Sequence, residues 1–227
     1  KKYIFGKRDS IHIIDLTQTL ELTNIALEKV YKTIVEGGKI LFISTKKQAS
    51  ESIASLAKET NQYYVNHRWL GGMLTNWGTI SNSIKKLQKI DIDLVSENRG
   101  FTKKELLKMT VQRDKLQRSL GGISEMKKIP DLVFIVDTNY ESLAIKESIK
   151  LGIPIIAILD TNSDPEGINF PIPGNDDARR SIDLYCNLIK ETIFNANKEA
   201  PKLKEEEPII ENKTKENKNL KTIKEID

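Results

Sequence analysis

Residues 131–162 read DLVFIVDTNYESLAIKESIKLGIPIIAILDTN, and this stretch decides the fold class. Its two apolar runs, at 131–137 and 154–160, are each followed by Thr-Asn, and the segment at 141–151 between them is expected to be a helix. A strand that is covered on both faces of a sheet reads as a continuous apolar run. Two such strands connected through a helix lie parallel. The stretch therefore predicts a strand–helix–strand unit of a buried parallel sheet.

The rest of the chain repeats this alternation of short apolar runs and helical segments. The other expected elements are strands at 39–44, 63–65 and 170–172, helices at 17–36, 46–60 and 176–195, and a hairpin joining 3–5 to 11–14. The last strand carries prolines, which an edge strand tolerates. We therefore predict an α/β protein with a three-layer, doubly wound (Rossmann/flavodoxin-like) parallel sheet.

An insertion at 79–122 interrupts the α/β pattern. Its apolar residues step alternately by four and three, which predicts an antiparallel coiled-coil hairpin. The tip is expected near Arg99-Gly100, and Thr102 with Glu105 forms a capping box that begins the second arm. The seam is expected to pair 80 with 120, 84 with 116, 87 with 113, 91 with 109 and 94 with 106, and it is interrupted by Asp91 and Arg113.

These elements divide the chain into four segments. We expect a first part of the α/β domain at 1–78, the hairpin at 79–122, a second part of the α/β domain at 123–197 and a disordered charged tail at 198–227. The tail is predicted to be disordered because it is rich in Lys, Glu and Asn and poor in apolar residues.

Composition limits the class of protein. Of the 227 residues, 38% are hydrophobic, which suffices for a core, and no apolar run is long enough for a membrane span. The start lacks both a secretory signal and a Met, so the true N-terminus is expected to be missing. The single cysteine, Cys186, excludes an internal disulfide and is expected to be a small residue of the protein core that is carried on a helix.

The charge is concentrated in the hairpin. The net charge is only +4, yet residues 79–128 contain 12 Lys or Arg against 6 Asp or Glu. A basic appendage on a near-neutral body predicts a polyanionic partner that is met on one side. The alternative is a pair of helices whose charges are simply solvated.

A loop of unusual composition precedes the hairpin. Residues 64–77 read YVNHRWLGGMLTNW and contain both tryptophans and a Gly-Gly pair. A guanidinium suits phosphate, an indole can stack on a base, and glycines let the backbone approach closely. We expect one tryptophan to be buried between hairpin and sheet and the other to reach RNA. The alternative is an ordered loop whose tryptophans only fill a core.

The sequence argues against enzyme chemistry. No GxGxxG or GxxxxGK[ST] motif follows a strand, and no nucleophile or acid–base pair can be assigned. Thr45-Lys46-Lys47 at a helix start could still hold a phosphate. Four acids at strand ends, Asp137, Asp160, Asp176 and Asp177, are expected to be helix caps or contacts with a protein partner. The alternative is a site for a divalent ion.

Four motifs carry a family resemblance. They are YVNHRWLGGMLTNW, FTKKELLKMTVQRDKLQRSLGGI, IPDLVFIVDTN and LDTNSDPEGINFPIPGNDDARRSI. They closely resemble the family of the second protein of the small ribosomal subunit, in its bacterial or organellar form. The resemblance runs from about residue 1 to 195. Two parts depart from it: the family segment that precedes KKYIFG is absent, and the charged tail is not shared.

The resemblance implies a Rossmann-like domain with a protruding coiled-coil hairpin and no catalysis. It implies binding to small-subunit rRNA and to neighbouring ribosomal proteins, including the large mRNA-binding first protein of that subunit. The ribosome would lie in the bacterial cytoplasm or an organelle matrix. The alternatives are a nucleotide-binding enzyme on the same fold and an adaptor related to eukaryotic laminin receptors, which the bacterial character of the motifs disfavours. The candidate RNA contacts are Lys1, Lys2, Lys7, Arg8, Lys46, Lys47, His67, Arg68, Trp69, Asn76, Trp77, Arg99, Lys103, Lys104, Arg113 and Arg118.

Overall fold

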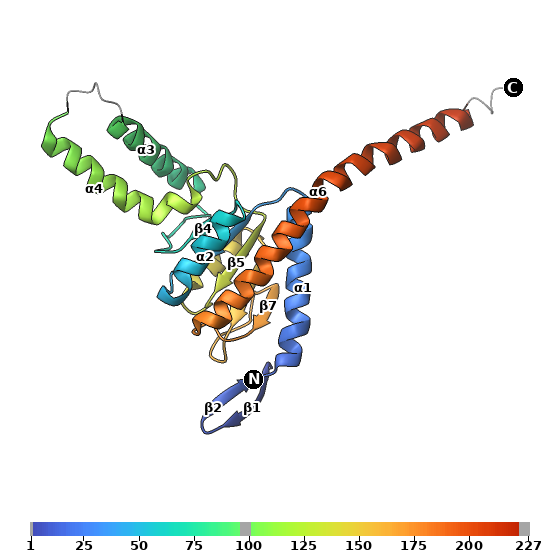
Figure 1. Ribbon diagram of the computed structural model, residues 1–227, viewed down its shortest axis with the longest axis horizontal. Coiled ribbons are helices and arrows are strands. Elements are labelled where there is room, and N and C mark those ends of the chain that lie inside the picture. The colour runs from blue at the N-terminus through green and yellow to red at the C-terminus, as the bar shows by residue number, and fades with distance from the viewer. Residues whose placement is uncertain (1, 96–100, 223–227) are drawn as a thin grey trace.

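The computed structural model describes the backbone of residues 2–95 and 101–222, and side-chain surroundings within 2–95 and 101–200. An α/β body carries two helical arms that project in different directions, a helical hairpin and the end of the last helix (Figure 1). A small β-hairpin lies at the opposite end of the body from the helical hairpin.

The body is built on a five-stranded sheet. Its strand order is β4-β3-β5-β6-β7, and every neighbouring pair is parallel. In chain order the strands would read 2-1-3-4-5, so the predicted flavodoxin-like fold is confirmed. The strands are β3 (Ile40–Ile43), β4 (Tyr63–Val65), β5 (Leu132–Val136), β6 (Ile155–Leu159) and β7 (Phe170–Pro173).

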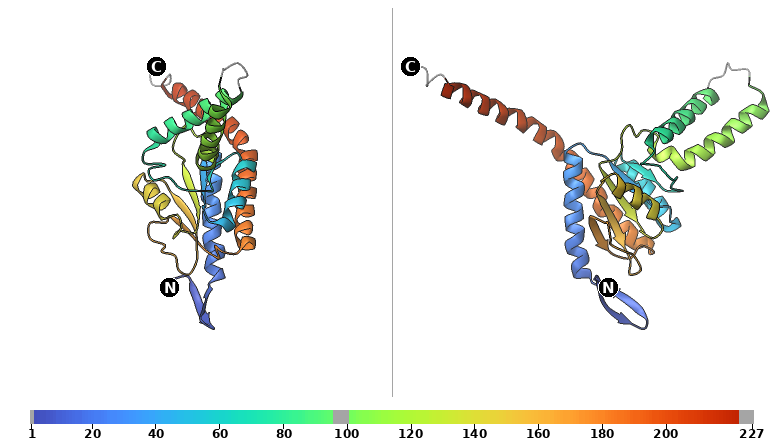
Figure 2. Two further views of the ribbon diagram at one scale, coloured as in Figure 1. Left: turned by 90° about the vertical axis from the view of Figure 1, so that its left-hand side faces the viewer. Right: turned by 180° about the vertical axis from the view of Figure 1, so that it is seen from behind.

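Alternate side chains of the strands enter two separate cores. In β3, Ile40 and Phe42 face one core, and Leu41 and Ile43 face the other. The first core lies under α1 (Leu16–Val35), α2 (Lys47–Glu59) and α6 (Arg179–Thr222). The second lies under α5 (Ser142–Lys150), the tryptophan loop and the base of the helical hairpin. The view in Figure 2 shows the resulting three layers.

The helical hairpin consists of α3 (Trp77–Val95) and α4 (Lys103–Leu120), followed by the short 3-10 turn η1 (Gly121–Ile123). The predicted capping box is confirmed: Thr102 Oγ1 accepts from the Glu105 N–H, and the Glu105 carboxylate accepts from the Thr102 N–H at 2.9 Å. The expected tip at Arg99-Gly100 lies outside the described residues.

Burial along the predicted seam of the hairpin is strongest near its base. Ile80, Ile84 and Leu87 are buried as expected, but the next buried position is Ile90 rather than Asp91. Towards the tip, Leu94 is only half-buried and Leu106 is 37% exposed, so a coiled coil along the whole length is not confirmed. The reason is that only the base half also packs against the body, which buries its apolar residues in the second core.

The tail has a helical backbone as far as Thr222, and its predicted disorder stays a prediction. Helix α6 continues without a break past Lys198 to Thr222 and projects away from the body (Figure 1). Lys and Glu are good helix formers, so their abundance favours a helical backbone. The scarcity of apolar residues, on which the prediction of disorder rested, decides instead whether such a helix has a face to pack.

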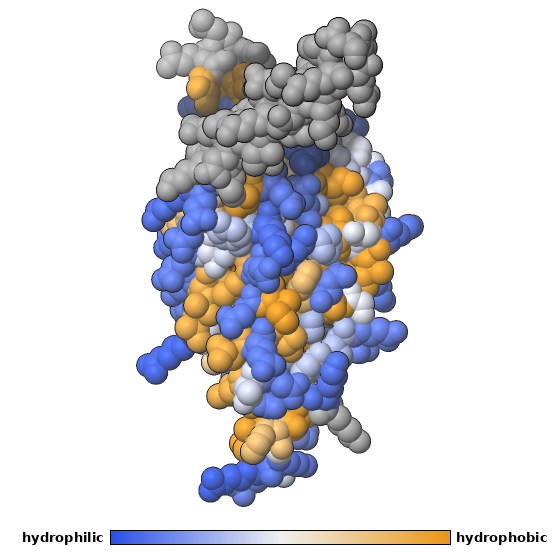
Figure 3. All heavy atoms as spheres, turned by 90° about the vertical axis from the view of Figure 1, so that its right-hand side faces the viewer, coloured by the Kyte–Doolittle hydropathy of each residue, from blue (hydrophilic) through white to orange (hydrophobic). Residues whose placement is uncertain are grey.

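The β-hairpin pairs β1 (Ile4–Arg8) with β2 (Ile11–Ile14), as predicted. Its turn uses Asp9 and Ser10 with φ of 47° and 66°, which suits the twist of a two-residue hairpin loop. On the face that carries α1 and α6, apolar side chains are exposed among charged ones (Figure 3). The exposed large apolar side chains of the β-hairpin and the start of α1 include Phe5, Ile11, Leu16 and Leu20.

Two further predictions concern single features of the helices. Cys186 is buried in the first core, as expected, and burial raises the pKa of its thiol to about 12, so it remains protonated. Among the described residues, no helix is long and apolar enough to cross a membrane.

Gly122 fixes the hairpin to the sheet, and we expect Gly122→Ala to lower the free energy of unfolding by about 2 kcal/mol. A Cβ at this position would stand 2.1 Å from the carbonyl oxygen of Tyr64 in the backbone of β4. Gly78→Ala is the matched control, because no atom lies within 4 Å of a Cβ there and alanine favours the helix by about 1 kcal/mol. Chemical denaturation of both variants measures the difference, and equal midpoints would contradict the close approach.

Candidate nucleic-acid interface

The tryptophan loop is held by one carboxylate from the core of the protein. Glu147 on α5 accepts hydrogen bonds from Trp69 Nε1 at 3.0 Å and from the backbone N–H of Gly72 at 2.8 Å. Its second oxygen accepts from the N–H groups of Leu74 and Thr75 at 2.9 and 3.0 Å, and from Thr75 Oγ1 at 3.1 Å. A non-repetitive loop has no ladder of its own, so this carboxylate supplies its missing acceptors.

These five donors determine the ionisation state of the Glu147 carboxyl group. Burial on its own would raise the pKa of the carboxyl group, but the hydrogen bonds from Trp69, Thr75, Leu74 and Gly72 together lower it below its usual value. Glu147 therefore remains ionised at neutral pH although it is 9% exposed. A buried charge of this kind is stabilised only while its donors remain in place.

The buried half of the expectation for the two tryptophans is confirmed, and the structure shows that Trp69 is the buried one. Trp69 is 8% exposed and packs in the second core, so it is the buried wedge. Trp77, the first residue of α3, is half-buried against the same core. His67 and Arg68 are exposed, and exposed Asn76 accepts a hydrogen bond from Thr79 Oγ1 at 2.9 Å through its side chain. The loop therefore presents His67, Arg68 and Asn76, not Trp69, to a partner.

The hairpin presents its cations unequally. Lys103 and Lys104 are exposed in the first turn of α4, and Arg118 is exposed in its last turn. Arg113 lies half-buried beside Asp114, with Nε 3.1 Å from the carboxylate oxygen. Arg118 and His67 both line a hollow of about 250 Å³ at the base of the hairpin. We call the exposed cations of the loop and the hairpin, Arg68, Lys103, Lys104 and Arg118, the basic region; its two parts meet at the base of the hairpin, where Arg118 and His67 line the same hollow.

The N-terminal candidates lie elsewhere. Lys2, Lys7 and Arg8 belong to the β-hairpin, at the opposite end of the body from α3 and α4 (Figure 1). Arg8 pairs with Asp9 at 3.7 Å, and Lys2 Nζ lies 5.6 Å from the centre of the Tyr3 ring. Lys1 lies outside the described residues, as does Arg99. The structure does not bring this group together with the basic region at the hairpin.

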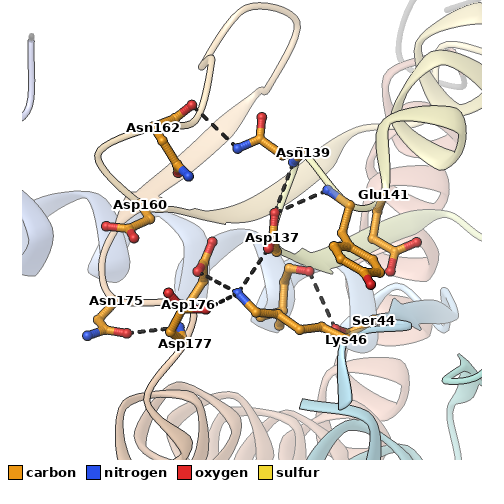
Figure 4. A network of polar contacts seen from close by, with 12 residues as sticks. Ser44, Lys46, Asp137, Asn139, Glu141, Asp160, Asn162, Asn175, Asp176 and Asp177 are labelled. Carbon is orange, nitrogen blue, oxygen red and sulfur yellow. Dashed lines mark hydrogen bonds and ion pairs between the residues drawn. The ribbon is translucent and has the colours of Figure 1, made fainter. Parts of the chain in front are cut away.

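Lys46 occupies the carboxyl edge of the sheet and is not free to hold a phosphate. Its ammonium lies 2.9 Å from Asp137, 2.9 Å from Asp176 and 2.5 Å from Asp177, and its side chain is only 11% exposed (Figure 4). Burial on its own would lower the pKa of Lys46, but the three carboxylates raise it well above its usual value. Neighbouring Lys47 is exposed at the start of α2.

The crevice that doubly wound proteins use for nucleotides is closed here. It lies at the switch point between β3 and β5, beyond their carboxyl ends. Lys46 follows β3 and Asp137 follows β5, so their ion pair spans the crevice. The Thr45 N–H and Oγ1 donate to the Glu141 carboxylate, which stands where a phosphate would accept them. Burial, with a contribution from nearby Asp137, raises the pKa of Glu141 above its usual value.

The four acids at this edge have different roles, and one expected role was wrong. Asp137 adopts a φ of 69° and caps the following turn by accepting from the N–H groups of Asn139 and Tyr140. Asp176 is not a helix cap, because its carboxylate is taken by Lys46. The turn that precedes α6 is held by Asn175 instead, since its Oδ1 accepts from the N–H groups of Asp177 and Ala178 at 2.8 Å.

Comparison with known proteins agrees with this picture. The model of the family "Ribosomal protein S2" matches residues 1–196. The "Small ribosomal subunit protein uS2" of Phenylobacterium zucineum is 59% identical over 193 residues, which cover 85% of this chain and 65% of that protein. The proteins of the same name from Parvibaculum lavamentivorans and Sinorhizobium medicae are 55% and 58% identical over 85% and 83% of this chain, and 76% and 74% of their own lengths.

The family match and these relatives define a structural protein of the small ribosomal subunit, rather than an enzyme, that functions in translation in association with the ribosome and its rRNA. The chain belongs to the ribosomal protein S2 family, in its bacterial form. The resemblance carried by the four sequence motifs is thereby confirmed, and the nucleotide-binding alternative is not supported.

Proposed function

We propose that the chain binds small-subunit rRNA through the basic region formed by the tryptophan loop and the helical hairpin. The observation that supports this proposal is the lack of acidic partners for its exposed cations. Within the described residues, Arg68, Lys103, Lys104 and Arg118 form no ion pair with a carboxylate. Unpaired cations on one projecting surface attract a polyanion, and phosphates release counterions when such cations bind them.

The remaining candidates contribute less to this proposal. Lys47 and Asn76 are exposed and remain proposed rRNA contacts. Trp69 is buried and Lys46 is paired with carboxylates, so both are proposed to stabilise the fold instead. The group Lys2, Lys7 and Arg8 would require a second rRNA segment at the far end of the body (Figure 1).

The hairpin lysines provide the direct test. The double substitution Lys103→Ala plus Lys104→Ala should reduce the slope of log affinity against log salt by about 1.5, because two phosphate contacts are lost. Salt titrations of the full chain with purified small-subunit rRNA measure this slope. Lys29→Ala plus Lys32→Ala is the matched control on α1, at the far side of the body (Figure 1). A hairpin variant that retains the parent slope would refute the proposed contact.

Protein neighbours are proposed for the other side of the body. Phe5 and Ile11 of the β-hairpin and Leu16 and Leu20 of α1 are between 64% and 80% exposed. Large apolar side chains exposed close together mark protein–protein contacts, and these four lie on consecutive elements of the chain. We propose that this surface lies against a neighbouring ribosomal protein, with the large mRNA-binding first protein of the subunit as one such neighbour. We also propose the bacterial cytoplasm, rather than an organelle matrix, as the compartment of its ribosome.

The carboxyl edge is proposed to be structural. Lys46 already neutralises Asp137 and Asp176 at its centre, whereas Asp177 is largely exposed. Oxygen atoms of Asp160, Asp176 and Asp177 nevertheless lie within 4.8 Å of one another, close enough to share a cation. Our proposal is that Lys46 is the counter-ion of this edge and that its exposed acids contact a protein partner. Its test is described below with the substitutions of Lys46.

A further inference from the structure

The hollow at the base of the helical hairpin is closed in by three elements. Its walls come from the end of α2, from β4 with the first residues of the tryptophan loop, and from the last turn of α4. The volume is about 250 Å³, which suits one nucleotide and not a duplex. The polar side chains on its walls include Lys58, Tyr64, Asn66, His67, Gln117 and Arg118.

The charge of this hollow is unbalanced. No Asp or Glu lines it, and among the described residues neither Lys58 nor Arg118 has an acidic partner. The ammonium of Lys58 lies 5.7 Å from the centre of the Tyr64 ring, which positions it on one wall. Arg118 stands on the opposite helix, so the two cations flank the hollow from α2 and α4.

On the other side of α2, in contrast, the cations that line a hollow do have acidic partners. A second hollow of about 330 Å³ lies between α2 and α6 and is also lined by polar side chains. There, Arg179 pairs with Glu51 at 2.9 Å, and Lys190 pairs with Glu59. That hollow neutralises itself with its own residues, whereas the one at the hairpin base leaves its positive charge for a ligand.

The neutral side chains of the basic hollow suit a nucleobase. The Asn66 amide nitrogen donates to the Ser50 carbonyl at 3.2 Å, which fixes this amide in place. The Gln117 side chain has no hydrogen-bond partner within the described residues. Amides can bond to the edge of an unstacked base, and the planar His67 imidazole can stack on its face. A guanidinium and an ammonium suit the phosphate.

We infer that this hollow receives a single unstacked nucleotide of the small-subunit rRNA. Its phosphate lies between Lys58 and Arg118, and its base lies against the amides and His67. The inference rests on the proposed rRNA binding and adds two things to it: the site of one nucleotide, and Lys58 as a contact outside the hairpin and the tryptophan loop.

Binding measurements with variants of the full chain test the inference. Lys58→Ala plus Arg118→Ala should weaken binding to small-subunit rRNA by at least about tenfold at physiological salt and reduce the salt slope by about 1.5. Arg179→Ala plus Lys190→Ala removes the same charge from the self-neutralised hollow and should leave both values near those of the parent. Lys58→Arg keeps the charge and should retain most of the affinity. Thermal melting of each variant ensures that losses are not due to unfolding.

Photo-crosslinking locates the nucleotide independently of any substitution. Trypsin releases residues 59–68, ETNQYYVNHR, as one peptide that contains Tyr64, Asn66 and His67. Irradiation of the parent chain bound to rRNA should yield this peptide with a nucleotide adduct, detected by mass spectrometry. Tight stoichiometric binding of a free nucleoside monophosphate would instead assign the hollow to a soluble ligand and overturn the inference.

The outcomes separate this inference from the proposed function. If the parent binds rRNA and the Lys103 and Lys104 variant lowers the salt slope, the proposed function stands. Should the Lys58 and Arg118 variant then bind like the parent, with no adduct on residues 59–68, the nucleotide site is refuted alone. If the parent chain does not bind rRNA at all, both are refuted.

Discussion

Glu147→Ala should lower the free energy of unfolding by about 3–5 kcal/mol, because removing one partner leaves several buried polar groups unsatisfied. The indole N–H of Trp69 and the backbone N–H groups of Gly72, Leu74 and Thr75 would all lose their acceptor. Glu147→Gln keeps the shape but places an amide N–H among donors, so a loss of about 2 kcal/mol is expected. Denaturant titrations monitored by tryptophan fluorescence report both the global stability and the environment of Trp69.

The contribution of Glu147 should also depend on pH. Because its folded-state pKa is lowered below the usual 4.5, the stability it provides is present above that value and is lost as the pH falls through the folded pKa. The parent should therefore lose its advantage over Glu147→Gln in acid. Glu191→Ala, at an exposed position of α6, is the control and should change stability by less than about 0.5 kcal/mol. If Glu147→Ala and Glu191→Ala unfold alike, the carboxylate does not hold the loop.

Lys46→Met should lower the free energy of unfolding by about 3 kcal/mol, because it leaves the carboxylates of Asp137 and Asp176 buried together without a cation. Burial already raises the pKa of Asp176 above its usual value although Lys46 opposes this, so removal of the ammonium should promote its protonation. Lys47→Met is the control, since the adjacent lysine is exposed and should change stability little. Thermal unfolding at neutral pH compares the two.

The same variants decide the nature of the carboxyl edge. Adding Asp137→Asn and Asp176→Asn to Lys46→Met removes the repulsion and should recover part of the loss. Metal analysis of the purified parent protein provides an independent test of this edge. A tightly bound, stoichiometric divalent ion that disappears in Asp160→Ala would contradict the proposal that Lys46 is the counter-ion of this edge.

The sequence predicts the fold well because its signals are local. Continuous apolar runs such as 132–136 and 155–159 identify buried strands, and intervening helices require them to lie parallel. The hairpin base and the capping box at Thr102 also follow from short-range spacing. The tail shows what such signals leave open, because low hydrophobicity reports on packing and not on backbone conformation.

The long-range partners could not be predicted in the same way. Glu147 is 78 residues from Trp69 in sequence, and Lys46 is 130 residues from Asp176. Their pairing depends on how the strand order brings loops together at one edge of the sheet. The only local signal was a glutamate on the buried face of α5, between Ala144 and Ser148. An acid at such a position indicates that some donor must approach it from elsewhere in the chain.

The attachment of the helical hairpin has a mechanical consequence. Helix α3 has 19 residues and is therefore about 28 Å long at 1.5 Å per residue, and the segment held by Glu147 leads directly into its first turn. A small change in the loop would therefore be amplified along the length of α3. A tilt of α3 by about 10° at its first turn would displace its other end by about 5 Å, which is the pitch of one helical turn. If the cations near the tip bind phosphates as proposed, their position depends on a rigid attachment of the helix, and the carboxylate of Glu147 provides that rigidity.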